Sequence, residues 1–262
     1  MEMAANEDPI IRVEGLVAAY GDTVVLRDIS FSVNPGEVFV ILGDSGCGKS
    51  TLLKNMIGLD RPEAGSVLIE GQDMLAATGK GLRDLLRTFG VTYQTGALFG
   101  SMTLLENVCL PMEVSTRLSR EAMDLIATMK LDLVGLRDFA HHMPAEVSGG
   151  MQKRTAIARA MALDPQILFM DEPSAGLDPI TSAELDSLIR NLADTLNMTF
   201  VIVTHELASI FAIADRVIML QKAAKTIVAE GRPEDLKQDK TNPWVWGFFN
   251  RKPETKDSEV NE

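Results

Sequence analysis

The stretch of sequence that decides the fold is VFVILGDSGCGKST, residues 38 to 51. Its apolar first part, Val38 to Leu42, predicts a buried strand, and Gly43 to Ser50 fits the phosphate-loop pattern G-x-x-x-x-G-K-[ST]. A helix is expected next, from about Lys49 to Ile57. In such a turn, backbone N–H groups and the helix N-terminus bind phosphate. We therefore predict a nucleotide site here, rather than a glycine-rich turn with a buried lysine.

Individual roles follow from the chemistry of the loop. Lys49 is expected to reach the β- and γ-phosphates, and Ser50 to hold Mg²⁺. Cys47 lies beside a helix N-terminus and Lys49, which predicts a lowered thiol pKa, inhibition by alkylation and protection by ATP. Cys109 is expected in the core. The residues predicted to bind nucleotide in this loop are Gly43, Asp44, Ser45, Gly46, Cys47, Gly48, Lys49, Ser50 and Thr51.

Composition narrows the class of protein. The chain has 262 residues, a formal net charge of −12 and 46% hydrophobic residues. This acidity argues against nucleic acid as a partner and against electrostatic binding to anionic lipid. Two cysteines indicate a reducing compartment rather than a disulfide scaffold. No signal peptide or apolar run of about 18 residues is visible, so another chain would have to span any membrane that this protein serves.

The pattern along the chain predicts an α/β fold. Strands and helices alternate after Ile167, which indicates a largely parallel sheet covered on both faces. A helical texture from Gly96 to Ala145 indicates an insertion, and a tail begins near Gln238. Strands are expected at residues 11–13, 24–26, 29–33, 38–42, 66–69, 167–170, 199–204 and 217–220, and helices at 49–57, 182–196 and 207–214.

Two carboxylates follow the apolar run Ile167 to Met170. An acid at the carboxyl end of such a strand lies at the crevice where ligands bind. Asp171 is expected to serve Mg²⁺ through its water shell, and Glu172 to orient or deprotonate the attacking water. Alone, a strand that ends in two acids is usually a solvated turn. Because these acids occur in a chain with a phosphate loop, we favour the role in the site.

A second glycine-rich helix start lies at Val147-Ser148-Gly149-Gly150-Met151. Ser148 is a good N-cap, and the glycines leave bare amides at the positive end of a helix. A simple helix cap is the alternative. Because this start lies far in sequence from the phosphate loop, a site that needs both would form between two copies of the chain.

With these motifs in order, the span from about residue 10 to 231 resembles the ATPase subunits of ABC transporters. The resemblance implies a P-loop NTPase core with a mainly parallel sheet, an antiparallel β subdomain and an inserted α-helical subdomain. The ATPase domain would cover residues 8–237, with the core at 8–94 and 160–237 and the helical subdomain at about 95–159. The motifs are the phosphate loop, Gln94, the signature Ser148 to Met151, Asp171-Glu172, the loop Ser174 to Asp178, and His205.

The resemblance also implies how these residues act together. ATP would be sandwiched in a homodimer, with Ser148, Gly149 and Gly150 of one subunit contacting the γ-phosphate bound by the other. Asp178 would link the two sites, and Tyr20 would stack on adenine unless it is an ordinary turn tyrosine. The implied catalytic residues are Lys49, Gln94, Glu172 and His205. The alternative for His205 is a purely structural role. The implied Mg²⁺ ligands are Ser50, Gln94 and Asp171.

Departures from the common signature Leu-Ser-Gly-Gly-Gln point to a narrower branch. Val147 and Met151 replace its ends, but the Ser-Gly-Gly centre is intact, so hydrolysis is expected to survive. Together with the stretch Tyr93 to Phe99 and the tetrapeptide Asp178 to Thr181, this resembles the ATPases of MCE-associated lipid transporters such as the Mla system. That implies phospholipid transport from the cytoplasmic face of the inner membrane. The implied partners are a permease (MlaE-like), an MCE-domain lipid-binding protein (MlaD-like) and a small STAS-domain subunit (MlaB-like).

The tail at 238–262 carries both tryptophans, Trp244 and Trp246, inside an aromatic segment at 242–250. Large aromatic side chains are costly to leave in water. The segment either packs on its own subunit or docks on the second ATPase subunit or a regulator. Truncation after Gln238 tests the second possibility. The acidic end after Pro253 is expected to be disordered.

Other functions stay open at this point. An ATPase of an importer for small polar solutes is the nearest alternative. ABC ATPases of translation or DNA repair usually carry a second nucleotide domain or a long coiled coil, which this chain lacks. A non-hydrolysing ATP-gated scaffold is disfavoured by Glu172 and His205.

Overall fold

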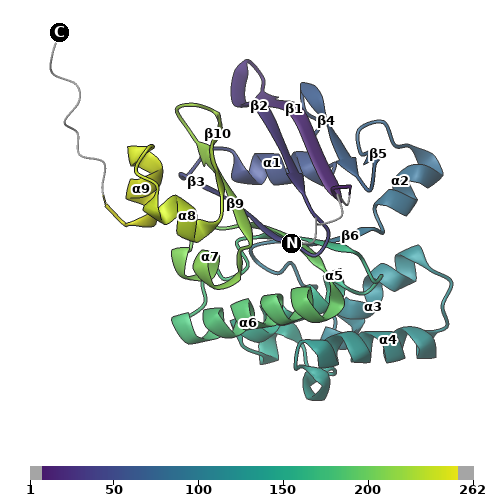
Figure 1. Cartoon of the computed structure of the whole chain (residues 1–262). Helices are drawn as coiled ribbons and strands as arrows, with labels where there is room; N and C mark the ends of the chain where they lie inside the picture. Colours follow the sequence, from purple (N-terminus) through teal and green to yellow (C-terminus); the bar gives the residue numbers. More distant parts are fainter. Residues whose placement is uncertain (1–7, 253–262) are drawn as a thin grey trace, which may run out of the picture.

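The computed structural model describes residues 8 to 252, which form two sheets with helices below and beside them (Figure 1). The strands are β1 (Ile11–Tyr20), β2 (Thr23–Val33), β3 (Val38–Gly43), β4 (Ala64–Ile69), β5 (Gln72–Asp73), β6 (Phe89–Thr92), β7 (Ile167–Asp171), β8 (Thr199–Val203), β9 (Arg216–Gln221) and β10 (Thr226–Gly231). The α-helices are α1 (Lys49–Met56), α2 (Gly79–Leu85), α3 (Leu104–Ser115), α4 (Arg120–Leu133), α5 (Gly149–Ala160), α6 (Pro179–Leu196), α7 (Leu207–Ile213), α8 (Pro233–Gln238) and α9 (Pro243–Phe249).

The larger sheet has the order β10-β9-β3-β8-β7-β6 and is parallel except for the β9–β10 pair. Its register places Ile41 of β3 and Asp171 of β7 on either side of Val203 of β8. The carboxyl ends of these three strands therefore meet at one edge of the sheet. The prediction of an α/β fold with a mainly parallel sheet is confirmed.

The smaller sheet, β2-β1-β4-β5, is antiparallel, as expected for the β subdomain. The prediction of two separate strands at 24–26 and 29–33 was wrong, because β2 runs without a break from Thr23 to Val33. Asp28 lies between the two predicted strands and has a left-handed backbone, with φ 51°. The ladder with β1 shifts register in this region but does not end.

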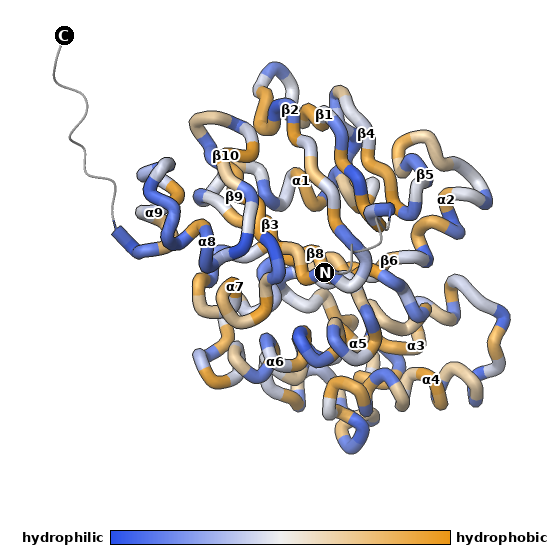
Figure 2. The backbone as a smooth tube through the Cα atoms, in the orientation of Figure 1, coloured by the Kyte–Doolittle hydropathy of each residue, from blue (hydrophilic) through white to orange (hydrophobic). Residues whose placement is uncertain are grey.

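Strand alternation divides the apolar residues into two cores. On β3, the side chains of Phe39 and Ile41 face the core under the smaller sheet, while Val38, Val40 and Leu42 face the helices. The other central strands, β7 and β8, divide their residues in the same way. Figure 2 shows the apolar centre of the sheet between the two more polar outer layers. The edge of the sheet at which β3, β7 and β8 end is therefore packed on both faces.

The helical insertion between β6 and β7 holds α3, α4 and α5, which contact one another. After β7, helix α6 begins at Pro179 rather than at the expected Ser182. Asp178 caps this helix and proline fits its first position, so the helix gains its opening turn. Within residues 8–252, no helix is long and apolar enough to cross a bilayer.

The aromatic segment of the tail forms α9 and packs on its own chain. Val245 and Phe249 are buried, and the Phe249 ring meets the ring of Phe211 on α7 edge-on at 5.8 Å between centroids. Asn250 Nδ2 donates to the backbone carbonyl of Lys237 at 3.0 Å. The inner face of α9 therefore packs on its own subunit, which was one of the two alternatives. Docking of the segment on a partner stays a prediction. The acidic end after Pro253 lies outside the described residues.

Candidate functional site

The phosphate loop joins β3 to α1 in an open conformation. The N-cap of α1 is Gly48, with φ 105° and no side-chain cap, so no side chain of the loop occupies the first amides of the helix. Lys49 Nζ donates to the carbonyl oxygens of Gly43 at 2.9 Å and Asp44 at 3.0 Å. A Cβ on Gly43 would lie 2.1 Å from the carbonyl oxygen of Leu220, so only glycine fits there. The uncapped amides at the start of α1, beside a lysine, fit a polyphosphate.

The two carboxylates lie where β7 ends beside the loop. Burial raises the pKa of Asp171 and the charge of Glu172 raises it further, whereas the Ser50 hydroxyl and the Lys49 charge act in the opposite direction. Two of the predicted Mg²⁺ ligands, Ser50 and Asp171, therefore lie together. Within residues 8–252 no group of three His, Cys, Asp or Glu side chains could hold a metal.

Glu172 is joined to His205. Glu172 Oε1 lies 2.7 Å from Nδ1 of His205, which follows β8. The other carboxylate oxygen, Oε2, is buried and has no hydrogen-bond partner among the described residues. The Glu172 backbone is left-handed, with φ 47°, and its N–H donates to the Val203 carbonyl at 2.8 Å. An unpartnered buried acceptor in a constrained position fits a group that binds a water molecule.

Gln94 lies two residues beyond β6, the strand next to β7, so it belongs to the same edge of the sheet. Its side chain is exposed, while its backbone carbonyl accepts a hydrogen bond from Lys153 of α5. Lys153 was not predicted. The contact spans 59 positions of sequence, and no local pattern indicates it.

The signature forms the start of α5. Ser148 caps the helix, its Oγ accepting from the Met151 N–H at 3.2 Å, as predicted. Ser148 and Gly149 are exposed, but Gly150 is buried. The atoms nearest to a Cβ built on Gly149 or Gly150 belong to Leu177 and Thr181, so this start packs beside the loop before α6. Helix α1 instead contacts β1, β3, β7 and β8, in a different layer (Figure 1).

Asp178 lies beside the signature, and Tyr20 lies beside the phosphate loop. Asp178 Oδ1 accepts from the N–H groups of Ile180 and Thr181, both at 3.1 Å, and the hydrogen bonds from Thr181 lower the Asp178 pKa. Tyr20, at the end of β1, is 53% exposed, and its hydroxyl lies 3.4 Å from Thr51 Oγ1 in the first turn of α1. The Tyr20 hydroxyl also donates to Asp60 Oδ2 at 3.1 Å, so the half-exposed ring is held at the rim of the phosphate loop. Its stacking on adenine and the cross-site role of Asp178 stay predictions.

The predicted activation of Cys47 was wrong. The residue is only 2% exposed, and burial raises the pKa of its thiol more than Lys49 and nearby backbone hydrogen bonds lower it. Cys109 is in the core, as predicted, and burial raises its pKa to about 12. The prediction for Cys47 took account of the nearby helix N-terminus, which lowers a thiol pKa, but not of burial, which raises it.

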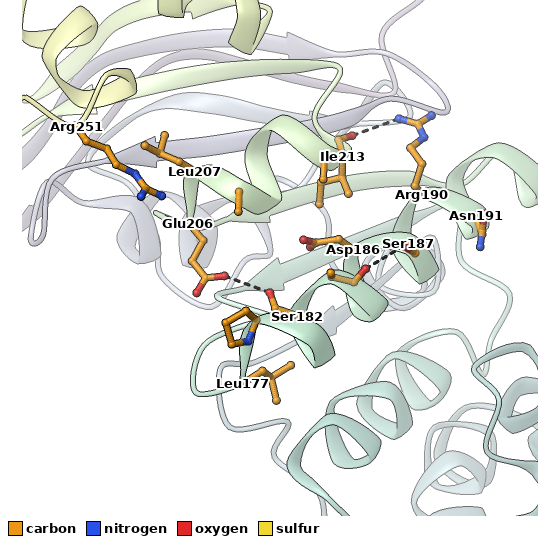
Figure 3. Close-up of a pocket in the computed structure, with 14 residues that line it drawn as sticks. Leu177, Ser182, Asp186, Ser187, Arg190, Asn191, Glu206, Leu207, Ile213 and Arg251 are labelled. Atoms are coloured by element: carbon orange, nitrogen blue, oxygen red, sulfur yellow. Dashed lines mark hydrogen bonds between the residues drawn. The ribbon is translucent and has the colours of Figure 1, made fainter.

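A hollow of about 590 Å³ lies between α6 and α7, away from the phosphate loop (Figure 3). In the view shown, Leu177 lies at one end of the hollow, and Arg251 lies at the other end of the same side, beyond Glu206. Burial raises the pKa of Asp186 in its wall. This hollow was not predicted from the sequence.

Comparison with known proteins decides the family. The ABC transporter family model matches residues 26–175, more than half of the chain. The chain belongs to the ABC transporter family. It is 41% identical to the probable ribonucleotide transport ATP-binding protein mkl of Mycobacterium leprae, over 92% of this chain and 68% of that protein. It is 39% identical to the intermembrane phospholipid transport system ATP-binding protein MlaF of Haemophilus influenzae, over 87% of this chain and 86% of that one. The methionine import ATP-binding protein MetN of Brucella abortus is 36% identical over 87% of this chain and 61% of its own length.

Solved structures of ABC cassettes share the fold. Cassette cbiO1 of Clostridium perfringens aligns with a TM-score of 0.81 at 29% identity, covering 89% of this chain and 92% of its own. The bacterial cassette MJ0796, solved as a dimer, aligns with a TM-score of 0.76 at 31% identity, over 85% and 98%. The same cassette has been solved in a post-hydrolysis state with ADP and Pi. This member of the family is an ABC-type ATPase that binds ATP, and its resemblance to Mla ATPases is confirmed.

Proposed function

We propose that this ATPase works as a homodimer that closes on ATP and powers a membrane permease that moves phospholipid or a related hydrophobic molecule. The observation that carries the proposal is the MlaF likeness, which extends over most of both chains. The chain would be a peripheral subunit on the cytoplasmic face of the inner membrane.

One half of the proposed nucleotide site would lie within a single subunit. Lys49 would exchange its two loop carbonyls for the β- and γ-phosphates, because a phosphate is the stronger acceptor for an ammonium group. Ser50, Asp171 and Gln94 would hold Mg²⁺, which when bound would offset the negative charge of the phosphates. Tyr20 would cover adenine at the rim of the loop.

Water activation falls to Glu172. Its buried Oε2 is free to accept a hydrogen bond from water, while Oε1 stays bonded to His205. Glu172 as a carboxylate can only accept, so in this role Nδ1 of His205 would carry a proton and the bond would fix the ring. A donor to phosphate from Nε2 as well would require the doubly protonated ring. His205 is 65% exposed, which leaves Nε2 open toward an arriving γ-phosphate. Glu172 would take the proton as the water oxygen attacks phosphorus and the bond to ADP breaks.

The second half of each site would come from the partner subunit. Ser148 and Gly149 are exposed at the positive end of α5, in a layer apart from α1. A face-to-face dimer brings such a helix start to the γ-phosphate held by the other phosphate loop. Asp178, which caps α6 beside the signature, would lie at the same interface.

The permease would dock at the Gln loop (residues 93–99). Tyr93 is 39% exposed and Phe99 50%, which places two aromatic side chains of this loop in water. Exposed aromatic groups are typical anchors of interfaces. An MCE-domain (MlaD-like) protein and a STAS-domain (MlaB-like) subunit would complete the transporter.

The alternative is the ATPase of an importer for small polar solutes. The likeness to MetN favours it, although it covers a smaller share of that protein. The two functions differ in the molecule that stimulates ATP turnover by the complete transporter: phospholipid in the first, a small polar solute in the second.

The test starts with the tagged protein purified with its partners from detergent-solubilised membranes. Reconstituted in vesicles, the complex is expected to hydrolyse ATP, to lose turnover by at least about 100-fold in Glu172→Gln, and to move fluorescent phospholipid between vesicles only with ATP. Stimulation by methionine or a ribonucleotide, without lipid movement, would support the importer instead. Unchanged turnover in Glu172→Gln would contradict the assigned base.

A further inference from the structure

A lysine from a distant part of the chain lies at the phosphate loop. Strand β9 runs beside β3, and its register pairs Leu220 with Gly43, the first residue of the loop. The two backbones come close there, since a Cβ on Gly43 would lie 2.1 Å from the Leu220 carbonyl oxygen. The chain that leaves β9 therefore starts beside the loop, and Lys222 is the first residue after this strand.

The side chain of Lys222 reaches the middle of the loop. Gly46 has φ 75°, and Lys222 Nζ lies 3.8 Å from the place that a Cβ on Gly46 would take. Apart from Gly46 and its two chain neighbours, no other atom of the described residues lies within 4 Å of that place. The ammonium group therefore stands at an open side of the loop rather than at a packed one.

The turn that carries Lys222 is anchored. The Lys225 N–H donates to the Gln221 carbonyl at 2.8 Å and closes the turn between β9 and β10. The Lys225 carbonyl in turn accepts a hydrogen bond from the Arg27 N–H of β2 at 2.7 Å. The backbone of the turn is thus bonded to a strand of each sheet, and Lys222 extends toward the loop from a fixed base.

The charge of Lys222 is available to a ligand. Its side chain is exposed, and within residues 8–252 no carboxylate oxygen lies within 4.0 Å of its ammonium group, unlike that of Lys130, which is paired with Asp164. The loop itself carries Asp44 and Lys49, whose formal charges cancel. Lys222 therefore gives the loop a net positive charge.

A further cation matters because the site also holds two acids. Asp171 and Glu172 follow the end of β7 at the same edge of the sheet, and their charges oppose the approach of a triphosphate. A cation at the rim of such a site raises the local concentration of anions and the rate at which they bind.

We propose that Lys222 is a second cation of the nucleotide site, whose charge draws the phosphate chain of ATP to the loop, whereas Lys49 would contact the phosphates directly. The inference rests on the proposed binding of phosphate at residues 43–51. Because Lys222 is exposed, its attraction acts through solvent and is screened by salt, with a Debye length of about 10 Å at 0.1 M and about 3 Å at 1 M. This dependence on salt separates an effect of charge from an effect on structure.

The test measures binding of a fluorescent ATP analogue, with Mg²⁺, to the purified subunit at low and high ionic strength. In about 0.05 M salt, Lys222→Met is expected to bind about three- to tenfold more weakly than wild type. In about 1 M salt the difference should fall below about twofold. Lys222→Arg keeps the charge and is expected to bind within about twofold of wild type at both ionic strengths.

Lys225→Met is the matched control, because it removes the same charge from the same turn at a residue whose ammonium group is not within 4 Å of the Gly46 position. It is expected to bind the analogue within about twofold of wild type. Circular dichroism and thermal unfolding check that each variant folds. If Lys222→Met is unstable, Lys222→Gln removes the charge in its place.

Two results would overturn the proposal. Equal binding by Lys222→Met and Lys225→Met in low salt would show that Lys222 is an ordinary solvated lysine. A loss in Lys222→Met that persists unchanged in high salt would show that the residue acts on structure. Lys49→Met distinguishes either result from failure of the proposed site: weak binding by Lys49→Met confines the failure to Lys222, whereas tight binding would refute the phosphate loop and the inference with it.

Discussion

The two glycine-rich helix starts of this chain look alike in sequence and differ in structure. At α1, the cap is a left-handed glycine and Lys49 bonds to the loop itself, which leaves amides and a cation ready for phosphate in the same subunit. At α5, Ser148 already occupies one amide, and the second glycine is buried against Thr181. The first start therefore offers free amides and a cation to a ligand within one subunit, whereas the second is a packed surface that needs a ligand brought to it.

Removal of the charge at the first start should have the largest effect. Lys49→Met is expected to weaken ATP binding by at least about 100-fold even in the isolated subunit, because a charged hydrogen-bond donor to phosphate is lost. Fluorescent-nucleotide titration measures this. Binding within about twofold of wild type would show that the loop does not depend on Lys49.

Ser148 separates capping from phosphate contact at the second start. Ser148→Ala is expected to lower the free energy of unfolding by about 1 kcal/mol through loss of the cap. Ser148→Asp keeps the cap and so the stability, but its charge would face the partner's γ-phosphate, and turnover should fall by about 100-fold.

Urea unfolding and steady-state turnover measure the two effects separately, with nucleotide binding by the isolated subunit as the control. Equal turnover in Ser148→Asp and wild type would contradict a role for this helix start in hydrolysis.

The two signature glycines should respond differently to a methyl group. A Cβ on Gly150 would lie 2.4 Å from Thr181 Cγ2, whereas one on Gly149 would meet Leu177 at an ordinary 3.8 Å. Gly150→Ala is therefore expected to destabilise the fold by about 1–3 kcal/mol, and Gly149→Ala by less. Thermal unfolding measures both. Thr181→Ser removes the clashing methyl and should restore stability to Gly150→Ala; failure to do so would place the strain elsewhere.

Thiol chemistry gives the smallest effect and tests whether burial outweighs the helix terminus at α1. Because burial raises the Cys47 pKa above 9.0, the reactive thiolate is scarce at neutral pH and becomes more abundant as pH rises toward the folded pKa. Alkylation of native protein at pH 7 should be slower than that of a model thiol by about tenfold or more, since the thiol is also only 2% exposed.

Mass spectrometry of labelled peptides over a pH series measures this rate, with urea-unfolded protein as the reference. Alkylation of Cys47 in native protein as fast as in unfolded protein would reinstate the activated thiol.

Sequence predicted most of what depends on local pattern. The strand before Gly43, the acids after Met170 and the cap at Ser148 each follow from a few neighbouring residues and a known geometry. The predicted break in β2 and the late start predicted for α6 were errors of local pattern. The error at Cys47 was of another kind, because burial of its thiol depends on the sheets packed around it.

The site was predictable to the same extent. Parallel strands bring their ends to one edge, so the proximity of the phosphate loop, Asp171 and His205 followed from their positions after strands. The bond between Glu172 and His205 depends on side-chain orientation, and Lys153 reaches the Gln94 carbonyl across 59 positions. Neither leaves a periodic signal in the sequence.

The left-handed backbone at Glu172 has an evolutionary consequence. A side chain held at φ 47° costs on the order of 1 kcal/mol that glycine would not incur. Mutation toward glycine at this position would therefore be favoured by folding and opposed only by the need for turnover. A duplicated copy freed from hydrolysis should lose this glutamate early, and its absence from a sister gene would mark a lineage that kept the fold and abandoned the reaction.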